Sequence, residues 1–284
     1  MNKLICVVGP TATGKTKKAV VLSKQAPSIL VSADSRQVYR WMDIVTGKDH
    51  PADFVLYGID IVEPDEDCSV SVWHDAVMPH IQRAWDEGKQ VIVVGGTGLY
   101  VKAITDGIET MSVPINQSLR DELSPLSITE LQNKLKEVDE QKFSSMNNSD
   151  VNNPRRLIRA IEISISPKSP LETRISNLES NIIGLKYSDE QIHHNKVRER
   201  VLSRLESGAI EETKTLLSKY DPSLKSMTAI GYKSIISHLK GELSYDQMIE
   251  NWVNDEMAYV KRQLTWFNKQ PVIWYDVESD KIAI

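Results

Sequence analysis

The sequence has little cysteine, and this limits the kinds of site it can build. Cys6 and Cys68 are the two cysteines among its 284 residues. Two thiols cannot form a disulfide framework or a four-thiolate zinc site. Because so few cysteines fit a reducing compartment, we expect a cytoplasmic protein.

Long hydrophobic runs are also missing from the sequence. The apolar run Leu4–Val8 is too short for the core of a signal peptide, and it ends at Gly9 and Pro10. No stretch approaches the roughly 20 apolar residues that a membrane-spanning helix needs. We therefore expect no membrane partner.

A surplus of basic residues is the third feature that the sequence lacks. The sequence has 34 lysines and arginines and 39 aspartates and glutamates, which gives a net charge of −5. Nucleic-acid-binding domains, in contrast, are usually basic. The charges are segregated, however, because residues 60–67 hold five acids and no base, while residues 192–204 hold four bases and one acid. Three arginines also lie within residues 155–159. The net charge therefore does not exclude RNA, but it predicts modest, salt-sensitive binding.

The composition that is present is that of an ordinary globular protein, with 40% hydrophobic and 26% charged residues. Strand and helix patterns alternate in the first part of the chain. The sequence predicts strands at 4–8, 29–32, 55–61 and 90–94, and helices at 15–25 and 70–87. This alternation predicts a parallel α/β sheet.

A phosphate-binding loop follows the first predicted strand. Lys15 in such a loop can neutralise phosphate oxygens, Thr16 can bind Mg²⁺ through its hydroxyl, and the backbone N–H groups form an anion site at a helix N-terminus. The pattern is typical of ATP-binding and other nucleotide-binding proteins, but it specifies only a diphosphate or a triphosphate. The residues that match G-x-x-x-x-G-K-[ST] are Gly9, Pro10, Thr11, Ala12, Thr13, Gly14, Lys15 and Thr16.

The aspartate that usually holds the metal ion beside such a loop is not evident. The apolar strand at 91–94 ends in Gly95 and Gly96, and Asp60 is a weak substitute. The loop therefore fits either phosphoryl transfer or the binding of a diphosphate that leaves.

The rest of the chain is mainly helical. The sequence predicts a helix after a capping box at 127–130, a loop at 144–153, helices at 154–165, 189–207, 209–220 and 244–267, and late strands at 182–186 and 272–275, with a break at Pro167 and Pro170. We expect an α/β fold, a P-loop NTPase-like parallel sheet flanked by helices, with a small inserted helical subdomain and a helical C-terminal part. The expected bounds are 1–110 for the P-loop core, 111–150 for the insertion and 151–284 for the C-terminal part returning to the core.

Two more polar turns follow predicted strands. Asp34 follows the second strand, and Thr97 lies among glycines after the fourth. Ligands bind outside the carboxyl ends of parallel strands, so we expect Asp34 to point into the same crevice as Lys15, where its carboxylate can accept a proton. The glycines around Thr97 permit close backbone approach to a ligand. Taken alone, the first turn can also be a helix cap and the second an ordinary tight turn.

Together these motifs resemble one family, the tRNA dimethylallyltransferases, also called tRNA isopentenyltransferases. They occur in the family's order and span almost the entire chain. The sequence lacks the Cys/His zinc module of many eukaryotic members, so it resembles the bacterial type. The matching segments are residues 9–16, 34–39, 95–100, 153–160, 229–233 and 261–267.

The resemblance implies a prenyltransferase of tRNA processing and modification. Members move the dimethylallyl group of dimethylallyl diphosphate to N6 of the adenosine adjacent to the anticodon, position 37, in tRNAs that read codons starting with U, and diphosphate leaves. The implied partners are the tRNA anticodon stem-loop and dimethylallyl diphosphate. The implied cofactor is Mg²⁺, and we expect a monomer.

The family's residue roles can be carried onto matching positions. Residues 9–16 would hold the diphosphate, with Thr16 as the metal ligand. The catalytic residues would be Asp34, which takes the N6 proton, Thr97, which stabilises the departing diphosphate, and Lys15. The insertion at 111–150 would bind tRNA. The implied tRNA-binding residues are Asp34, Ser35, Arg36, Gln37, Thr97, Arg120, Arg155, Arg156, Leu157, Ile158 and Arg159.

Three other functions remain open on the residues alone. A sister transferase that prenylates free adenine nucleotides would share the loop and Asp34, although Arg155, Arg156 and Arg159 argue against it. A P-loop kinase of small metabolites is compatible with the loop and the fold. An RNA-binding protein with an inactive nucleotide site is the non-enzymatic alternative.

Several remaining features have two interpretations. The basic segment 192–204 can face RNA phosphates or solvent. His193 and His194 are adjacent, so they point to different sides of a helix and do not form a metal pair. We expect Trp252, Trp266 and Phe267 to pack between helices. The roles of Lys233 and Lys261 stay undefined.

Overall fold

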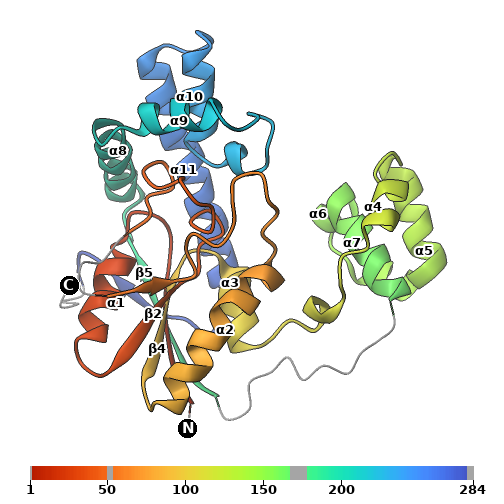
Figure 1. Cartoon of the computed structure of the whole chain (residues 1–284), viewed down its shortest axis with the longest axis horizontal. Coiled ribbons are helices and arrows are strands. Elements are labelled where there is room, and N and C mark those ends of the chain that lie inside the picture. Colours follow the sequence, from red (N-terminus) through yellow and green to blue (C-terminus); the bar gives the residue numbers. More distant parts are fainter. Residues whose placement is uncertain (1, 50–53, 167–177, 280–284) are drawn as a thin grey trace. The chain divides into compact units, whose positions relative to one another are not determined.

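A computed structural model describes residues 2–49, 54–166 and 178–279. Within these residues, a parallel sheet of six strands has the order β3-β2-β4-β1-β5-β6 (Figure 1). This confirms the predicted parallel α/β class. The strands are β1 (Asn2–Val8), β2 (Ser28–Ser32), β3 (Leu56–Tyr57), β4 (Gln90–Gly95), β5 (Leu178–Lys186) and β6 (Ile273–Asp276).

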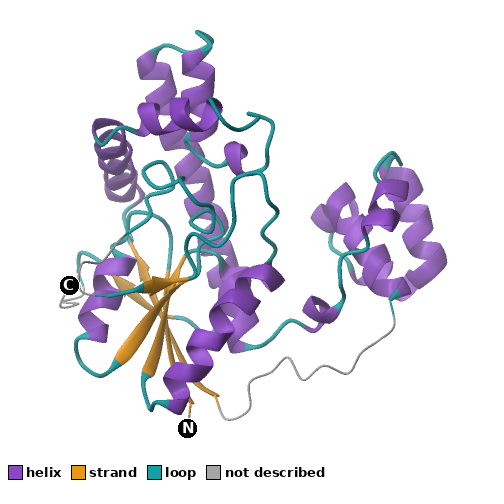
Figure 2. Ribbon diagram, in the orientation of Figure 1, coloured by secondary structure: helices purple, strands orange, loops and turns teal. Residues whose placement is uncertain are grey.

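Helices flank the sheet, and helices and loops form the rest of the described chain (Figure 2). None of the described helices is long and apolar enough to cross a membrane. The helices of the sheet-containing unit are α1 (Lys15–Ser23), α2 (Val70–Asp86), α3 (Gly98–Thr105), α8 (Glu190–Glu206), α9 (Ala209–Leu217), α10 (Tyr232–Leu239) and α11 (Tyr245–Phe267), with the 3-10 turn η2 (Ser226–Thr228). The other elements are η1 (Glu109–Ser112), α4 (Gln117–Leu123), α5 (Ile128–Ser145), α6 (Asn148–Val151) and α7 (Pro154–Ile165).

The two faces of the sheet carry separate hydrophobic clusters. Successive strand residues point to opposite faces, so Val7 of β1 packs in one cluster with Ala19 of α1. Its neighbour Cys6 packs in the other cluster with Trp73 of α2. Both faces are covered, which explains why β1, β2 and β4 read as continuous apolar runs in the sequence.

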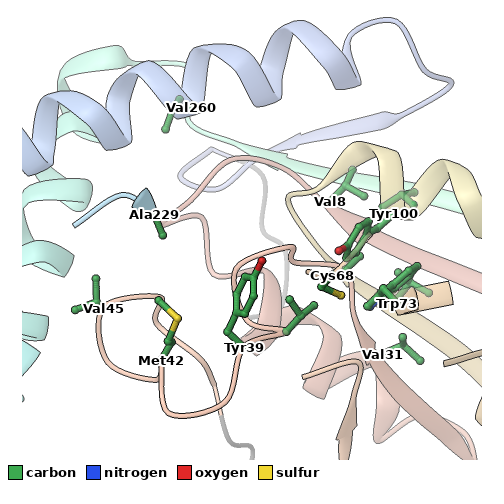
Figure 3. Packing of buried hydrophobic residues seen from close by; sticks show 14 of the residues in the cluster. Val8, Val31, Tyr39, Met42, Val45, Cys68, Trp73, Tyr100, Ala229 and Val260 are labelled. Atoms are coloured by element: carbon green, nitrogen blue, oxygen red, sulfur yellow. The ribbon is translucent and has the colours of Figure 1, made fainter. Parts of the chain in front are cut away.

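The larger cluster continues from the sheet into the loops beyond its carboxyl edge. Figure 3 shows Val8 and Val31 of the strands in one packed group with Tyr39 and Met42 of the loop after β2, beneath Val260 of α11. All five side chains are buried. The loop after β2 is therefore part of the core rather than a free surface segment.

The chain divides into two compact units. Met1–Gly107 and Arg174–Ile284 form the sheet-containing unit, and Ile108–Thr173 forms the second. The sequence prediction placed the insertion at 111–150 and assigned residues 154–165 to the C-terminal part. The structure instead groups α7 with α4 and α5 around a separate core, because Leu157 and Ile161 of α7 pack against Leu131 and Leu135 of α5.

Most predicted elements are present, and the capping signals were reliable. Ser127 and Ser244 begin capping boxes with Glu130 and Gln247, as the sequence patterns indicate. The Asn153 side chain caps α7 ahead of Pro154.

Several elements differ from the prediction. The third strand is only Leu56–Tyr57, because Gly58 and Asp60 take positive φ angles of 87° and 54° and end the strand. The predicted loop at 144–153 contains the short helix α6. Helices α3, α4 and α10 were not predicted: α3 and α10 begin without a side-chain cap, and α4 has only 7 residues. The predicted break at Pro167 and Pro170 lies outside the described residues.

Candidate active site

The order of the strands brings three loops to one edge of the sheet. β2, β4 and β1 are neighbours in the sheet, and parallel strands have their carboxyl ends at the same edge. A cavity of about 960 Å³ opens there, lined by residues from all three following loops. Lys15, Asp34 and Gly96 all line it, as the sequence analysis expects. Helices α8 and α11 supply further polar lining, namely Arg200, Arg204, Glu256, Tyr259, Arg262 and Gln263.

The phosphate-binding loop is compact and depends on glycine. Gly9 has φ of 135°, and a Cβ atom there would lie 2.2 Å from the Leu185 carbonyl oxygen. Gly14 precedes α1 with φ of 75°, so the first N–H groups of the helix point into the loop. Residues 11–17 line the cavity. The loop therefore has the shape that the sequence motif requires for an anion.

Lys15 lies partly buried within this loop. Its Nζ donates to the Pro10 carbonyl oxygen at 2.5 Å. Burial, and then the positive charge of Arg200, lower the pKa of Lys15 to about 8, with Asp34 acting in the opposite direction. Among the described residues, this partly buried cation has one side-chain hydrogen bond, to a neutral oxygen, so it is suited to receive an anion.

Two side chains from distant helices hold the phosphate-binding loop at Thr11. The Thr11 N–H donates to Gln263 Oε1 at 3.2 Å, and the Thr11 carbonyl oxygen lies 2.9 Å from His193 Nε2. Gln263 Nε2 also donates to the Gly96 carbonyl oxygen at 3.1 Å. Buried Gln263 thus links the loops after β1 and β4. This role was not predicted from the sequence, although Gln263 lies in the matching segment 261–267.

The turn after β2 presents Asp34 to the cavity. Asp34 Oδ1 accepts the Arg36 N–H at 2.9 Å, which fixes the orientation of the carboxylate and leaves Oδ2 for a ligand. Ser35 and Arg36 also line the cavity. Arg36 Nη1 lies 3.4 Å from the Lys225 carbonyl oxygen at the surface.

Thr97 connects two of the loops rather than facing the cavity. Its Oγ1 accepts the Ser35 N–H at 3.0 Å and lies 3.4 Å from Ser35 Oγ, and it is hydrogen-bonded to Tyr259. Burial, followed by the charge of Asp34, raises the pKa of Tyr259 to about 12. Thr97 is not among the cavity-lining residues that the structure describes. Its position therefore supports the loop that carries Asp34.

Gln37 differs from the expectation of a direct nucleotide contact. Its Oε1 accepts from Ser32 Oγ at 2.9 Å and its Nε2 donates to the Gly47 carbonyl oxygen at 3.0 Å. The side chain is 9% exposed. Although Gln37 lines the cavity, both ends of its amide are used to join the loop at 45–48 to β2.

Two arginines of α8 complete the cavity. Arg204 is 8% exposed and its Nη1 donates to Glu256 Oε1 of α11 at 3.0 Å. Arg200 Nη2 lies 3.4 Å from the Gly47 carbonyl oxygen. The Nε atoms of both arginines are buried and have no hydrogen-bond partner in the described part of the chain. Burial, and then the charge of Arg200, lower the pKa of Arg204 to about 10.

These arginines resolve the two interpretations of the basic segment 192–204. Arg200 and Arg204 lie one helical turn apart and face the cavity. Lys196 and Arg198 point to solvent and form ion pairs with Glu199 and Glu250. The segment therefore has one face toward the cavity and one solvated face. The spacing of four residues was the available signal.

The implied tRNA-binding residues of the second unit fall into two groups. Leu157 is fully buried and Ile158 is partly buried, and both side chains pack in the core of this unit. Arg120 Nη2 donates to Glu162 Oε2 at 2.9 Å, and Arg159 Nη1 donates to the same oxygen. Arg159 Nη2 also donates to the carbonyl oxygens of residues 110 and 113 at 2.6 and 2.9 Å.

Glu162 therefore organises this unit. It is fully buried, and although burial raises the pKa of its carboxyl, hydrogen bonds from Arg120, Asn116 and Arg159 outweigh this and hold the pKa below its usual value. Arg120 and Arg159 serve the fold in this arrangement. Arg155 and Arg156 are exposed at the start of α7, and Arg156 pairs with Asp150.

The remaining candidates lie away from the cavity lining. Asp60 forms an ion pair with buried Lys48 at 2.5 Å, so it is not placed as a metal ligand. Lys261 pairs with Glu190 at 3.0 Å, and Lys233 is exposed. Trp252 and Phe267 are buried, which confirms packing roles for them. Trp266 lies against Gly98, where a Cβ atom would be 1.9 Å from its Nε1.

The sequence matches two family models. The model described as IPP transferase covers residues 37–270, and the one described as isopentenyl transferase covers residues 2–60. The tRNA dimethylallyltransferase of Acetivibrio thermocellus is 35% identical over 98% of this chain and 93% of its own length. That of Macrococcus caseolyticus is also 35% identical, over 98% of this chain and 93% of its own.

Solved structures show the same similarity. The tRNA isopentenylpyrophosphate transferase of Bacillus halodurans is 33% identical, with a TM-score of 0.72 over 99% of this chain and 92% of its own. The corresponding Staphylococcus epidermidis transferase is 29% identical, with a TM-score of 0.71 over 100% and 95%. A eukaryotic dimethylallyltransferase acting on tRNA shares the fold, with a TM-score of 0.82 at 23% identity over 98% and 75%.

Proposed function

Because this chain belongs to the IPP transferase family, we propose that it transfers the dimethylallyl group of dimethylallyl diphosphate to N6 of the adenosine at position 37, beside the anticodon, in tRNAs that read codons starting with U. The chain is a transferase, and its action on tRNA is that of relatives named tRNA dimethylallyltransferase. One observation carries the finer proposal: the phosphate-binding loop and the Asp34 carboxylate line the same cavity.

The donor half of the cavity suits a diphosphate that leaves. Lys15, Arg200 and Arg204 present positive charge beside the N–H groups that begin α1. An allylic C–O bond breaks readily once the charge that develops on the leaving oxygens is stabilised by donors already in place. In the proposed reaction the diphosphate takes the bonding electron pair and the dimethylallyl carbon becomes electrophilic. Arg200 and Arg204 line this part of the cavity, and their buried Nε atoms have no hydrogen-bond partner among the described residues.

The acceptor half of the cavity suits an adenine amine. The exocyclic N6 is a weak nucleophile, and as its bond to carbon forms it must lose a proton. Asp34 can accept that proton, because the Arg36 N–H holds one carboxylate oxygen and leaves the other available. The base has to leave its stack to enter the cavity, and RNA loops are where unstacked bases are usually recognised. Thr97 and Tyr259 would hold the Asp34 loop in place.

The residues present fit a divalent cation. Thr16 lines the cavity next to Lys15, and Asp34, Asp49 and Glu256 are the carboxylates that also line it among the described residues. Mg²⁺ usually takes only one or two protein ligands together with phosphate oxygens and water. We propose that Thr16 would hold Mg²⁺ with the donor, where the bound ion would supply positive charge beside the diphosphate.

The transfer can be tested with purified protein, unmodified tRNA and dimethylallyl diphosphate. We expect N6-dimethylallyl adenosine in the nucleoside digest, located at position 37 by sequencing of the RNA fragments. Absence of this nucleoside would contradict the proposal. Free AMP as the better acceptor would favour the sister transferase, and phosphate transfer from γ-labelled ATP would favour a kinase.

We further propose that the enzyme acts in the cytoplasm as a monomer. Cys6 and Cys68 are both buried free thiols, which suits a reducing compartment. Light scattering at the concentration of the transfer assay would test the monomer.

A further inference from the structure

A loop at the active site carries an exposed tryptophan. Gln37 and Val45 both line the cavity, and Trp41 lies four residues from each. An extended chain covers at most about 3.6 Å per residue, so the Trp41 Cα lies within about 14 Å of both lining residues. We refer to residues 38–48 as the Trp41 loop. Trp41 exposes 62% of its surface, whereas Met42 beside it is fully buried.

The Trp41 loop is held from two sides. The Arg40 N–H donates to the Val62 carbonyl oxygen at 2.9 Å. Glu212 accepts the N–H groups of residues 43, 44 and 45 at 2.9, 2.6 and 3.1 Å. Lys48 is buried and donates to the Tyr39 carbonyl oxygen at 2.8 Å. Trp41 is therefore exposed on a loop whose backbone is held firmly by hydrogen bonds.

The indole ring has a fixed orientation. Trp41 Nε1 donates to Glu63 Oε2 at 2.9 Å. Glu63 is itself held, because it also accepts from Arg40 Nη1 and from the Tyr220 hydroxyl, each at 3.1 Å. One edge of the ring is thus anchored while most of its surface faces solvent.

Packing does not account for this residue. Trp41 has φ of 65°, a left-handed conformation that bulky side chains rarely adopt. Glycine would take it without strain, and the buried neighbours Tyr39 and Met42 already supply the core contacts of the loop. Strain of this kind, at an exposed and oriented aromatic residue beside a cavity, points to a ligand.

We propose that Trp41 is a stacking platform for an unstacked base of the anticodon loop near the reacting adenosine. The proposal rests on the proposed function, since it assumes RNA in the cavity. Aromatic faces are a common means of holding unstacked RNA bases. The Trp41 Cα lies within about 14 Å of two cavity-lining residues, a span of roughly four stacked nucleotides at 3.4 Å each, so we expect the platform to meet a base close to the target.

The charges nearby are compatible with a base and unfavourable for a phosphate contact. The acidic segment 60–67 adjoins the Trp41 loop. Three of its acids are paired within the chain, since Asp60 pairs with Lys48, Asp67 with Lys225 and Glu63 with Arg40. Stacking uses the face of a ring and needs no positive charge. We therefore expect the contribution of Trp41 to RNA affinity to be independent of salt.

The test measures the Kd of an anticodon stem-loop by fluorescence anisotropy, and the Kd of dimethylallyl diphosphate by calorimetry. Trp41→Gly should weaken stem-loop binding by about 5- to 150-fold, the range for one base stacked on an aromatic ring. It should leave the donor Kd unchanged and should raise Tm by relieving the backbone. Trp41→Phe keeps an aromatic ring, so its change in the logarithm of the stem-loop Kd should be less than half of the change for Trp41→Gly. The loss should be equal at about 50 and 200 mM salt, a range over which phosphate contacts weaken strongly.

Tyr245→Ala is the matched control, because Tyr245 is an exposed aromatic outside the cavity lining. It should change neither Kd. An unchanged stem-loop Kd for Trp41→Gly would overturn the proposal and leave a protein partner as the occupant of this surface. A parallel loss of donor binding would also overturn it. Failure of the proposed function is distinguishable, because the wild-type protein would then make no prenylated RNA.

Discussion

Two arginines that line the cavity and two arginines of the second unit are used in opposite ways. In the cavity, Arg200 and Arg204 are held by few hydrogen bonds and keep buried Nε atoms without a partner in the described structure. In the second unit, Arg120 and Arg159 surround the buried carboxylate of Glu162, and Arg159 also donates to two carbonyl oxygens. Sequence alone assigned the second pair to ligand binding and the first to an undecided helix face.

The difference shows that a charged residue indicates a binding function only once its hydrogen-bond partners are known. A buried N–H without an acceptor costs free energy, and a binding site can recover that cost when its ligand arrives. An arginine whose donors are satisfied has already contributed to folding. The comparison therefore predicts that substitutions in the cavity change chemistry and donor binding, whereas substitutions around Glu162 change stability.

The largest effect should come from Asp34→Asn, which tests the chemical side of the comparison. The amide keeps an oxygen for the Arg36 N–H but cannot take the N6 proton, so kcat should fall about 10²- to 10⁴-fold, the usual contribution of a general base. Single-turnover kinetics with tRNA would measure this, and calorimetry should give an unchanged donor Kd. Equal losses in kcat and donor affinity would contradict the role of a base.

Glu162→Ala tests the structural side of the comparison. It leaves Arg120 and Arg159 without their shared partner, so we expect the second unit to lose about 3 kcal/mol of stability. All six tryptophans lie in the sheet-containing unit. In urea, far-UV circular dichroism should therefore show an early transition, while the tryptophan fluorescence midpoint stays unchanged.

A matched shift of both signals in that experiment would show that Glu162 stabilises the whole chain. An unchanged dichroism curve would contradict its organising role. Glu122→Ala is the control, because Glu122 forms an exposed ion pair with Lys134 in the same unit. Such surface pairs contribute little to stability.

Arg204→Met should weaken donor binding by about 10- to 100-fold, because hydrogen bonds to charged groups contribute about 1.5–3 kcal/mol. Arg204→Met leaves the buried Glu256 carboxylate without its partner, which can destabilise the protein. The double variant Arg204→Met/Glu256→Gln removes this charge, so it separates the loss of donor binding from a loss of stability. Arg198→Met, on the solvated face of the same helix, is the control. If all three variants bound dimethylallyl diphosphate like the wild type, Arg204 would belong with the satisfied arginines.

The pH dependence of donor binding should reflect Lys15. Its pKa in the free protein is lowered to about 8, so it is protonated below that pH and loses its proton as the pH rises through 8. A diphosphate favours the charged form, so binding above pH 8 should take up a proton and weaken by up to about tenfold per pH unit. Calorimetry in buffers of different ionisation enthalpy would detect the uptake.

Two neighbours do not titrate in that window, since the pKa of Tyr259 is raised to about 12 and that of Arg204 is lowered only to about 10. Lys15→Arg keeps its charge, so its donor Kd should be flat between pH 7 and 9. A flat profile for the wild type would contradict this account of Lys15.

The smallest effects should come from Arg155→Ala and Arg156→Ala. Both side chains are exposed, and a phosphate contact by either one predicts a uniform loss of tRNA affinity and a salt slope smaller by about 1. Because Arg156 pairs with Asp150, we expect the larger change from Arg155. Unchanged affinity and slope for both would show that this helix does not contact the RNA backbone.

Much of the site was predictable because local motifs and sheet topology agree. Glycine spacing located the anion loop, and parallel strands place the residues that follow them at one edge, so Lys15 and Asp34 could be expected together. The arginines were harder, because sequence does not tell which face of a helix is buried. A signal for Arg159 existed, since Glu162 follows it by one helical turn, but the burial of that acid is a tertiary property.

Other parts of the site depend on contacts between distant segments. Gln263 joins the loops after β1 and β4 from a helix more than 160 residues later in the chain, and no local pattern indicates this. The short strand β3 was overestimated because an apolar run does not show where positive φ angles will end pairing. Helix α7 was predicted with its observed ends, yet only its packing against α5 shows to which unit it belongs.

The most direct test of the central claim compares two anticodon stem-loops that differ only in the base at position 37. One carries adenosine at position 37, and the other carries inosine, which lacks the exocyclic amine. With dimethylallyl diphosphate and wild-type protein, we predict release of one diphosphate per prenylated loop for the adenosine RNA and no product for the inosine RNA. Equal prenylation of both loops, or of neither, would contradict the account.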